Sequence, residues 1–272
     1  AYDWVIDGQG SPTTARLAWL SGARVRAGWA VRVWSRMYTH VVPRSGLAKV
    51  YVVRERQRFL EMLGVPIGEP RTRLVVTADE LRAAGTALRE AGVPEGVAKV
   101  ALVLSVSEPI REWPAERFAE LAHALSTEGV APVMLENPGD AAKLQRFRKV
   151  APDVPVVRVF DLRLMMATIG SCGVLVSGDT GPAHVATALG IPRVTLYGPT
   201  DPVQWNPLLP TTPVLVDPGV TVMRARERRQ HVQHPGLVGI PVEGVLQEVR
   251  RLLAARNDSS SAVTHLPIPA SR

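Results

Sequence analysis

Short apolar runs rich in β-branched residues alternate along the chain with longer stretches whose apolar residues recur every three or four positions. The first pattern is typical of buried strands and the second of amphipathic helices. Three such pairs follow one another: 99–104 with 115–125, 131–135 with 140–149, and 154–159 with 162–169. This alternation predicts βα units on a parallel sheet.

The alternation continues toward the C-terminus with a strand at 174–176, a helix at 182–189 and a strand at 193–197. We therefore predict a doubly wound α/β domain from about residue 97 to residue 216. An amphipathic helix is predicted over 243–256. Residues 257–272 contain serine and proline and offer little to bury, so we expect a disordered tail there.

The N-terminal part of the chain has fewer elements: a clear strand at 3–7, a helix at 13–20, a possible strand at 24–28 and a helix at 52–63. These are too few strands for a complete Rossmann sheet, so we expect half a domain. Proline and glycine breaks at 65–73 and 92–96 mark the residues between them as an interdomain connection.

The composition predicts neither a membrane span nor a disulfide framework. The apolar runs among the 272 residues end well before the roughly 20 residues needed to cross a bilayer. Cys172 is the only cysteine, which excludes an internal disulfide and a cysteine-based metal site within one chain and favours a reducing cytoplasm. The chain begins at Ala1 without a basic segment, a cleavage site or an initiator methionine, so we expect that its natural start is missing.

The net charge of +7 and the pI near 10.1 favour anionic partners, such as nucleic acid, an acidic membrane surface or a phosphorylated substrate. Aromatic residues make up only 5% of the chain. Because single-stranded nucleic acid is bound by aromatic side chains interleaved with basic ones, we expect no nucleic-acid partner.

The segment 174–190 carries the strongest chemical signal. A buried strand runs into a glycine-containing turn and then into a helix, with Thr180 or Gly181 as the cap and Pro182 at the first helical position. The free N–H groups and partial positive charge of such a helix end bind anions, so a diphosphate is expected there. His184, in the first helical turn, would add a ring N–H. The alternative is a tight βα connection beside a surface histidine.

A second turn, Tyr197-Gly-Pro-Thr200, follows the next predicted strand, so both turns lie at the carboxyl edge of the sheet, where open α/β sheets bind ligands. The segments Gly178-Asp-Thr-Gly-Pro-Ala-His184 and Ala188-Leu-Gly-Ile-Pro192, with this turn, resemble the signature region of the heptosyltransferase family, glycosyltransferase family 9. Further similar segments bring the resemblance to about residues 2–255: Tyr2–Gln9, Arg111–Phe118 and Ile240–Val249.

This resemblance implies a GT-B architecture, in which two Rossmann-like domains bind acceptor and donor, with the N-terminal one incomplete in this chain. Residues 1–92 would form the acceptor-side domain and the connection, and residues 93–256 the nucleotide-sugar-binding domain. The implied reaction transfers heptose from ADP-heptose to the lipopolysaccharide inner core, inverting the anomeric centre without a metal or a cofactor. The implied partners are this donor and an anionic glycolipid, in the cytoplasm or at the cytoplasmic face of the inner membrane.

The resemblance also implies a donor-binding site. The signature residues expected against the donor diphosphate are Asp179, Thr180, Gly181, Pro182 and His184. Because Asp179 is itself acidic, we assign it to loop hydrogen bonds or to a sugar hydroxyl. Asp140 matches a family glutamate that contacts the nucleotide ribose, and Ser105 and Ser107 stand where the family lines the donor cleft with small residues.

Arg111 stands where the family has a lysine that neutralises the leaving diphosphate, and His184 would share this catalytic role. The planar fork of arginine differs from a compact ammonium, so the geometry and the rate can differ from those of the family. The alternative interpretation is an exposed Arg111 before a buried Trp113.

The chain departs from the family at its start. Family members open with a strand and a glycine-containing turn bearing the aspartate proposed as catalytic base, and no comparable segment is found here, since Asp3 and Asp7 are poor replacements. Loss of a general base typically costs about 10²–10⁴-fold in rate. We therefore expect either a truncated sequence or an inefficient transferase.

A second departure is the segment 222–236, where many family members carry cysteines and this chain carries arginines. Within it, residues 224–234 would meet an anionic lipid head group or the phosphorylated core; a solvated basic loop is the alternative. His231 and His234 have no acidic cluster nearby, so we expect no metal site.

Three other functions compete with glycosyl transfer. Gly8-Gln-Gly10 after the first strand suggests a nicotinamide-dependent oxidoreductase, but Thr13 replaces the third glycine of that fingerprint and no acidic residue follows at the expected distance. A sugar-nucleotide epimerase of the same architecture shares the fold. A catalytically silent module that binds a nucleotide sugar or a glycolipid is the third alternative.

Overall fold

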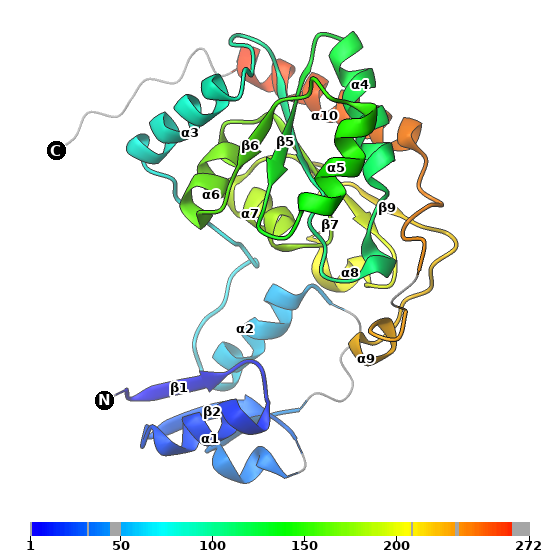
Figure 1. Ribbon diagram of the computed structural model, residues 1–272. Coiled ribbons are helices and arrows are strands. Elements are labelled where there is room, and N and C mark those ends of the chain that lie inside the picture. Colours follow the sequence, from blue (N-terminus) through cyan, green and yellow to red (C-terminus); the bar gives the residue numbers. More distant parts are fainter. Residues whose placement is uncertain (1, 32, 44–49, 208, 232–233, 263–272) are drawn as a thin grey trace, which may run out of the picture. The chain divides into compact units, whose positions relative to one another are not determined.

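Strands and helices alternate along the chain in the computed structural model, as the hydrophobic pattern predicts (Figure 1). The structure describes residues 2–31, 33–43, 50–207, 209–231 and 234–262. Its contacts divide into an N-terminal unit, residues 1–72 with 203–205, and a C-terminal unit, residues 73–202 with 206–272.

In its described part, the N-terminal unit contains a three-stranded parallel sheet in the order β1-β2-β3. Its elements are β1 (Trp4–Asp7), α1 (Pro12–Leu20), β2 (Val25–Trp29), the 3₁₀ helix η1 (Trp34–Met37), β3 (His40–Val42) and α2 (Val52–Met62). The ring of Trp29 on β2 packs on that of Phe59 on α2, with centroids 4.4 Å apart. The predicted strands and helices of this unit are confirmed, and β3 was missed because it has only three residues.

In its described part, the C-terminal unit contains a six-stranded parallel sheet in the order β6-β5-β4-β7-β8-β9. The strands are β4 (Lys99–Val103), β5 (Ala131–Glu136), β6 (Val156–Arg158), β7 (Val174–Gly178), β8 (Arg193–Tyr197) and β9 (Val214–Val216). From β4 the chain builds the sheet outward to β6 and then returns to add β7 on the other side of β4. This is the predicted doubly wound topology, and it creates a switch point between β4 and β7.

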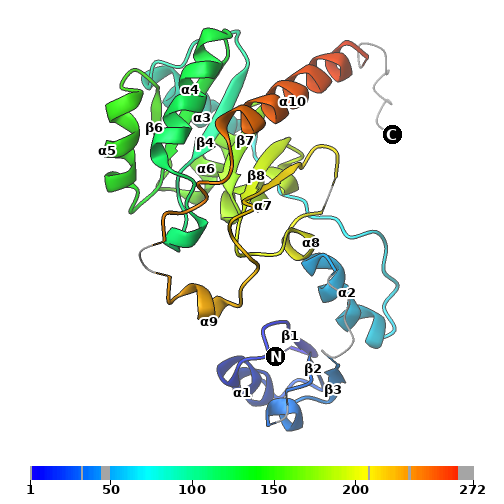
Figure 2. The ribbon, with the colours of Figure 1, turned by 90° about the vertical axis from the view of Figure 1, so that its right-hand side faces the viewer.

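Helices cover both faces of this sheet (Figures 1 and 2). One face packs against α4 (Ala115–Thr127), α5 (Ala141–Val150) and α10 (Val242–Ala262), the other against α3 (Ala78–Glu90), α6 (Leu162–Gly170) and α7 (Gly181–Leu189). Strand β4 illustrates this double coverage. Its residues Val100 and Leu102 pack into the core on the α4 side, and Ala101 and Val103 pack into the core on the α3 side. A strand buried on both faces has no polar alternation, which is the continuous apolar run seen in the sequence.

Helix α3 lies within the residues that the sequence analysis assigned to an interdomain connection. Thr77 and Glu80 form a capping box that starts the helix, a local signal that the flanking prolines and glycines obscured. The helix packs against α6, and Leu88 is buried in the core that it shares with the sheet. The C-terminal unit therefore begins at Arg73, whereas the predicted boundary lay between residues 92 and 93.

Helix α10 also extends further than predicted. It runs to Ala262, so residues 257–262, which we assigned to a disordered tail, are helical. The rest of that predicted tail, 263–272, lies outside the described residues.

Candidate functional site

A pocket of about 540 Å³ lies at the carboxyl edge of the C-terminal sheet. Its walls come from the segments that follow β4, β5 and β7, on both sides of the switch point, where doubly wound sheets bind ligands. The lining residues are Ser105, Val106, Ser107, Arg111, Pro138, Gly139, Asp140, Lys143, Thr180, Gly181 and Pro182. The fold thus brings together most of the residues predicted for the donor site. Asp179 and His184 are not among the lining residues.

The N-terminus of α7 forms one wall of the pocket. Thr180 is the cap, but its hydroxyl donates to the Gly178 carbonyl at 3.4 Å instead of accepting from the helix. Gly181 is the first helical residue, and its N–H has no hydrogen-bond partner within the described part of the chain. Pro182, which we predicted at the first position, occupies the second and has no N–H. The helix end therefore presents a free amide and its partial positive charge to the pocket.

The glycine turn of the N-terminal unit is built differently. The N–H groups of Gln9 and Gly10 both donate to Asp7 Oδ1 at 2.9 Å. The hydroxyl of Ser11 caps α1 by accepting from the Thr14 amide at 3.2 Å. The donors of this turn are thus used by the protein itself, whereas a dinucleotide-binding turn needs them for the pyrophosphate. This geometry disfavours the oxidoreductase interpretation.

Asp7 is also poorly suited to act as a base. Its second oxygen accepts a 2.5 Å hydrogen bond from the hydroxyl of Tyr38. Burial raises the pKa of Asp7, but the hydrogen bonds from Tyr38 and the turn amides outweigh burial and leave the pKa below its ordinary value. A carboxylate held in this way stabilises the turn, which agrees with the expectation that Asp7 is a poor replacement for the family's base.

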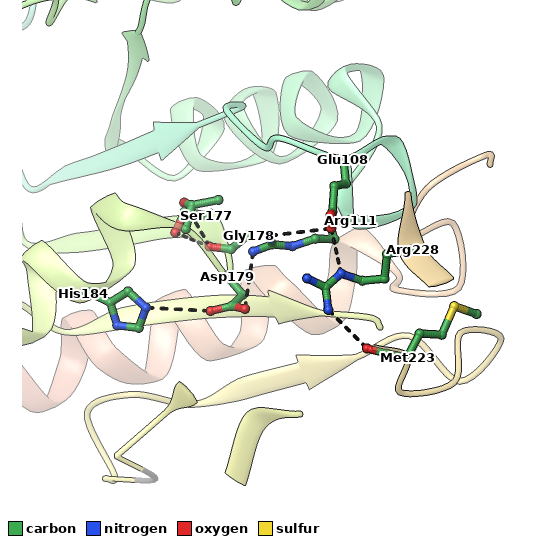
Figure 3. A network of polar contacts seen from close by, with 9 residues as sticks. Glu108, Arg111, Ser177, Gly178, Asp179, His184, Met223 and Arg228 are labelled. Carbon is green, nitrogen blue, oxygen red and sulfur yellow. Dashed lines mark hydrogen bonds and ion pairs between the residues drawn. The ribbon is translucent and has the colours of Figure 1, made fainter. Parts of the chain in front are cut away.

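Arg111, labelled in Figure 3, ends the 3₁₀ helix η2 (Pro109–Arg111). It lines the pocket, and its side chain is only 15% exposed. Its Nη2 donates to Asp179 Oδ2 at 3.3 Å, and its Nη1 lies 3.9 Å from Glu108 Oε2. Trp113 is buried as predicted. The alternative of an exposed arginine is therefore wrong: Arg111 is held between two carboxylates.

Asp179 contacts several side chains around the signature turn, residues 178–182, which connects β7 to α7. The carboxylate is buried, contacts Arg111 and the hydroxyl of Tyr197, and has Oδ1 3.9 Å from His184 Nε2. Burial raises the pKa of Tyr197 and the charge of Asp179 raises it further, so this hydroxyl stays protonated. These contacts are the loop interactions that we assigned to Asp179 because of its charge.

His184 does not line the pocket; it lies on the far side of Asp179 from Arg111, and its side chain is 42% exposed (Figure 3). Burial lowers the pKa of its ring, the charge of Asp179 opposes that change, and the charges of Arg193 and Arg111 lower the pKa further. The net result is a pKa below the ordinary 6.5, so the imidazole is neutral at neutral pH.

Asp140 and Ser105 both line the pocket and contact each other. The Ser105 hydroxyl donates to Asp140 Oδ2, and the same oxygen accepts the Asn137 amide at 3.1 Å. Asp140 is buried, and it closes the turn from which α5 starts. Ser107 lines the pocket from the exposed loop after β4.

Lys143 is a lining residue that the sequence analysis missed. It lies in the first turn of α5, with Nζ 3.1 Å from Glu112 Oε2 and 3.3 Å from the Val106 carbonyl. The sequence did offer a signal for Lys143: it lies three residues after Asp140, in a helix that starts at the sheet edge where the ligand site was predicted. With Arg111 it gives the pocket two cationic side chains, a combination that suits an anionic ligand.

The basic segment, residues 224–234, is not a uniformly solvated loop. It contains the short helix α9 (Ala225–Arg228), in which Arg226 is exposed but Arg228 is only 15% exposed. Arg228 Nε donates to Glu108 Oε2 at 2.7 Å and its Nη1 to the Met223 carbonyl at 3.1 Å. Residues 232 and 233 of this segment lie outside the described residues.

Two further features bear on function. Among the residues that the structure describes, no group of three or more histidine, cysteine, aspartate or glutamate side chains is placed to hold a metal ion. Over the same residues, no helix combines the length and the apolar character that crossing a bilayer requires.

The sequence is similar to a known family over most of its length. Glycosyltransferase family 9 (heptosyltransferase) matches residues 1–232. Lipooligosaccharide heptosyltransferase 2 of Haemophilus ducreyi is 30% identical over 156 residues, which cover 54% of this chain and 44% of that protein. Lipopolysaccharide heptosyltransferase 1 of Pseudomonas aeruginosa is 28% identical over 209 residues, covering 74% and 56%. The chain thus spans about half the length of these relatives.

Solved structures share the fold. A glycosyl transferase family 9 protein of Veillonella parvula gives a TM-score of 0.78 at 24% identity, covering 93% of this chain and 74% of that one. The E. coli heptosyltransferase WaaC with ADP gives 0.68 at 21% identity, covering 92% and 73%. These similarities confirm the predicted GT-B class, built from Rossmann-like units on parallel sheets.

Proposed function

Because the chain belongs to glycosyltransferase family 9, we propose that it binds a nucleotide-sugar donor in the pocket of its C-terminal unit and takes part in sugar transfer to a lipopolysaccharide core. The proposed donor is ADP-heptose and the proposed acceptor an anionic glycolipid, because the similar proteins are heptosyltransferases and one solved relative holds ADP. The proposed reaction inverts the anomeric centre, needs no metal, and takes place in the cytoplasm or at the inner membrane surface.

One observation carries this proposal: a free helix amide and two cationic side chains converge on a single pocket. Gly181 contributes the amide, and Arg111 and Lys143 contribute the charges. When a glycosyl bond to a diphosphate breaks, negative charge develops on the leaving oxygen. Donors fixed beforehand around that charge stabilise the transition state without reorganising, which is commonly the largest electrostatic contribution to catalysis.

The other pocket residues fit the rest of a donor. Asp140 presents a carboxylate of the kind that accepts hydrogen bonds from ribose hydroxyls, and Ser105 fixes its orientation. Asp179 would act from behind the wall by orienting Arg111. His184 would add a ring N–H only after a shift toward the pocket, because it does not line the pocket in this structure.

A single backbone atom tests the proposal. Gly181→Pro removes the N–H at a first-turn position where proline is tolerated, whereas Gly181→Ala keeps it. A Cβ at Gly181 meets no atom within 4 Å, so the alanine variant controls for the added side chain. We expect titration calorimetry to show ADP binding about tenfold weaker for the proline variant than for the alanine variant, since hydrogen bonds to charged groups contribute about 1.5–3 kcal/mol. Circular dichroism would confirm that both variants fold.

Equal ADP affinity in the two variants would contradict the assignment of the pocket. Titrations with UDP and NAD test nucleotide specificity, and tight NAD binding without ADP binding would favour an oxidoreductase. ADP release from ADP-heptose in the presence of a lipopolysaccharide precursor tests the transfer itself. ADP binding without such turnover would instead support the catalytically silent binding module.

A further inference from the structure

Four charged side chains form an alternating chain from α9 to the signature turn (Figure 3). Arg228 contacts Glu108, Glu108 lies near Arg111, and Arg111 contacts Asp179. The side chains of Arg228, Glu108 and Arg111 are 15%, 17% and 15% exposed, and that of Asp179 is 8% exposed. Two positive and two negative groups thus compensate one another in a largely buried row, where electrostatic interactions are strong.

The orientation of Arg111 depends on the two carboxylates beside it. Its Nε is buried and has no hydrogen-bond partner within the described part of the chain, so only the two Nη atoms hold it. Asp179 holds Nη2 at 3.3 Å, while Glu108 lies 3.9 Å from Nη1. A closer approach to Glu108 would draw the guanidinium away from Asp179.

Arg228 and Arg111 both face the carboxylate of Glu108. Arg228 occupies Glu108 Oε2 at 2.7 Å, the same oxygen that faces Arg111 at 3.9 Å. Its own position is fixed by the Met223 carbonyl, which accepts from Nη1 at 3.1 Å. Without Arg228, Glu108 would keep Arg111 as its nearest cation and would attract it more strongly.

We propose that Arg228 and Glu108 are a positioning pair for Arg111, so that α9 controls how the pocket presents this guanidinium to a diphosphate. Arg228 does not line the pocket and would act only through Glu108. The inference rests on the proposed function, in which Arg111 meets the donor diphosphate. It assigns a role to the one arginine that is largely buried among the described residues of the basic segment 224–234.

The test compares ADP and inorganic pyrophosphate binding to the full chain in four forms: the unchanged protein, Arg228→Met, Arg226→Met and the double variant Glu108→Gln with Arg228→Met. Arg226 is exposed on the same helix and controls for the lost charge. We expect Arg228→Met to bind about tenfold more weakly, a size typical of coupling within one salt-bridge network, and Arg226→Met to bind almost normally. The double variant should recover most of the affinity, because the neutral amide that replaces the Glu108 carboxylate no longer competes for Arg111.

A double variant that binds as weakly as Arg228→Met would overturn the proposal, since Arg228 would then act by another route. Equal losses in Arg228→Met and Arg226→Met would overturn it as well, because only total charge would matter. Thermal unfolding identifies any variant that fails to fold. If Arg228→Met unfolds because it leaves the Glu108 carboxylate unpaired, the double variant still tests the proposal, because both of its replaced side chains are neutral.

A ligand-free measurement separates this inference from the proposed function. The side-chain Nε–H resonance of Arg111, assigned by its loss in Arg111→Lys, should shift in Arg228→Met and not in Arg226→Met. If the unchanged protein binds neither ADP nor pyrophosphate, the proposed function fails while this shift still reports on positioning. If both ligands bind but the resonance does not respond to Arg228→Met, the positioning inference fails alone.

Discussion

The carboxylate of Asp179 and the guanidinium of Arg111 meet with Oδ2 3.3 Å from Nη2. This contact joins the signature turn after β7 to the segment after β4, 68 residues earlier. It explains why an acidic residue stands inside a turn suited to binding phosphate. Asp179 orients a cation at the pocket wall, and a carboxylate in direct contact with a diphosphate would repel it.

The charge of Asp179 should be visible in the titration of His184. The pKa of His184 lies below 6.5, and Asp179 raises it, so Asp179→Asn should lower that pKa further. Titration of the ring carbon signals by NMR, assigned with His184→Asn, measures this change. The exposed Asp153 offers a control, because Asp153→Asn removes the same charge and Asp153 is not among the groups that shift the pKa of His184. A His184 pKa that stays unchanged or rises on replacing Asp179 would show that the two side chains do not interact as the structure indicates.

Lys143 should contribute to anion binding although no sequence motif marks it. Lys143→Ala removes a cation from the pocket wall, and we expect ADP binding to weaken about tenfold, as for a charge-assisted hydrogen bond. Lys149→Ala, at an exposed position of the same helix, should change the affinity little. Lys143→Arg should recover part of the loss. Calorimetry at two salt concentrations would show whether the effect is electrostatic, and identical behaviour of the two alanine variants would argue against a direct role.

Tyr38 should stabilise the N-terminal unit through Asp7. Tyr38→Phe removes the donor of a buried hydrogen bond to a carboxylate, so we expect the free energy of unfolding to fall by about 1.5–3 kcal/mol at neutral pH. The pKa of Asp7 is lowered by folding, so its contribution is present above the ordinary value of 3.8 and is lost as the pH falls through the folded-state pKa. The difference between variant and parent should therefore shrink in acid.

Urea denaturation at several pH values measures the difference in free energy of unfolding between Tyr38→Phe and the unchanged protein. Tyr2→Phe is the matched control, because Tyr2 is 77% exposed and should show no such dependence. A Tyr38→Phe effect that is constant from neutral pH to below 3.8 would mean that the hydrogen bond to Asp7 does not carry the stabilisation.

Helix α3 should stabilise the C-terminal unit. Leu88 is 5% exposed in the core that also contains Cys172, and Leu88→Ala should cost about 2–5 kcal/mol. Burial raises the pKa of Cys172 to about 12, so the thiol reacts with alkylating reagents only when the unit opens. The alkylation rate should rise strongly in Leu88→Ala and much less in Leu81→Ala, whose side chain is 42% exposed on the same helix. Equal rates in both variants would place α3 outside the cooperative core.

Much of the fold was predictable because its signals are local. The strands from β4 to β8 and the helices between them follow from runs of a few residues whose side chains must face a core. The signature turn is local as well: Thr180 occupies the N-cap position of α7, Pro182 lies in its first turn, and Gly190 ends the helix at a positive φ of 73°. The location of the pocket follows from the order of these elements, because parallel strands share one carboxyl edge.

Helix α3 is an element for which the prediction from local sequence was wrong. Its capping residues Thr77 and Glu80 were visible in the sequence, but the prolines and glycines around them suggested a linker. Whether a segment between two breaks belongs to a domain depends on what it packs against, and the partner here, α6, begins more than 70 residues later. The sequence pattern alone does not show that α3 contacts α6.

The sequence by itself determined most of the strand and helix order, the family resemblance and most of the residues that line the pocket, because these signals lie within a few neighbouring positions. Only the tertiary structure decided how the charged side chains pair. Arg228 and Glu108 are 120 residues apart, and Arg111 and Asp179 are 68 apart. A buried charge finds its partner through the packing of distant elements, so its role becomes readable only once those elements are placed in space.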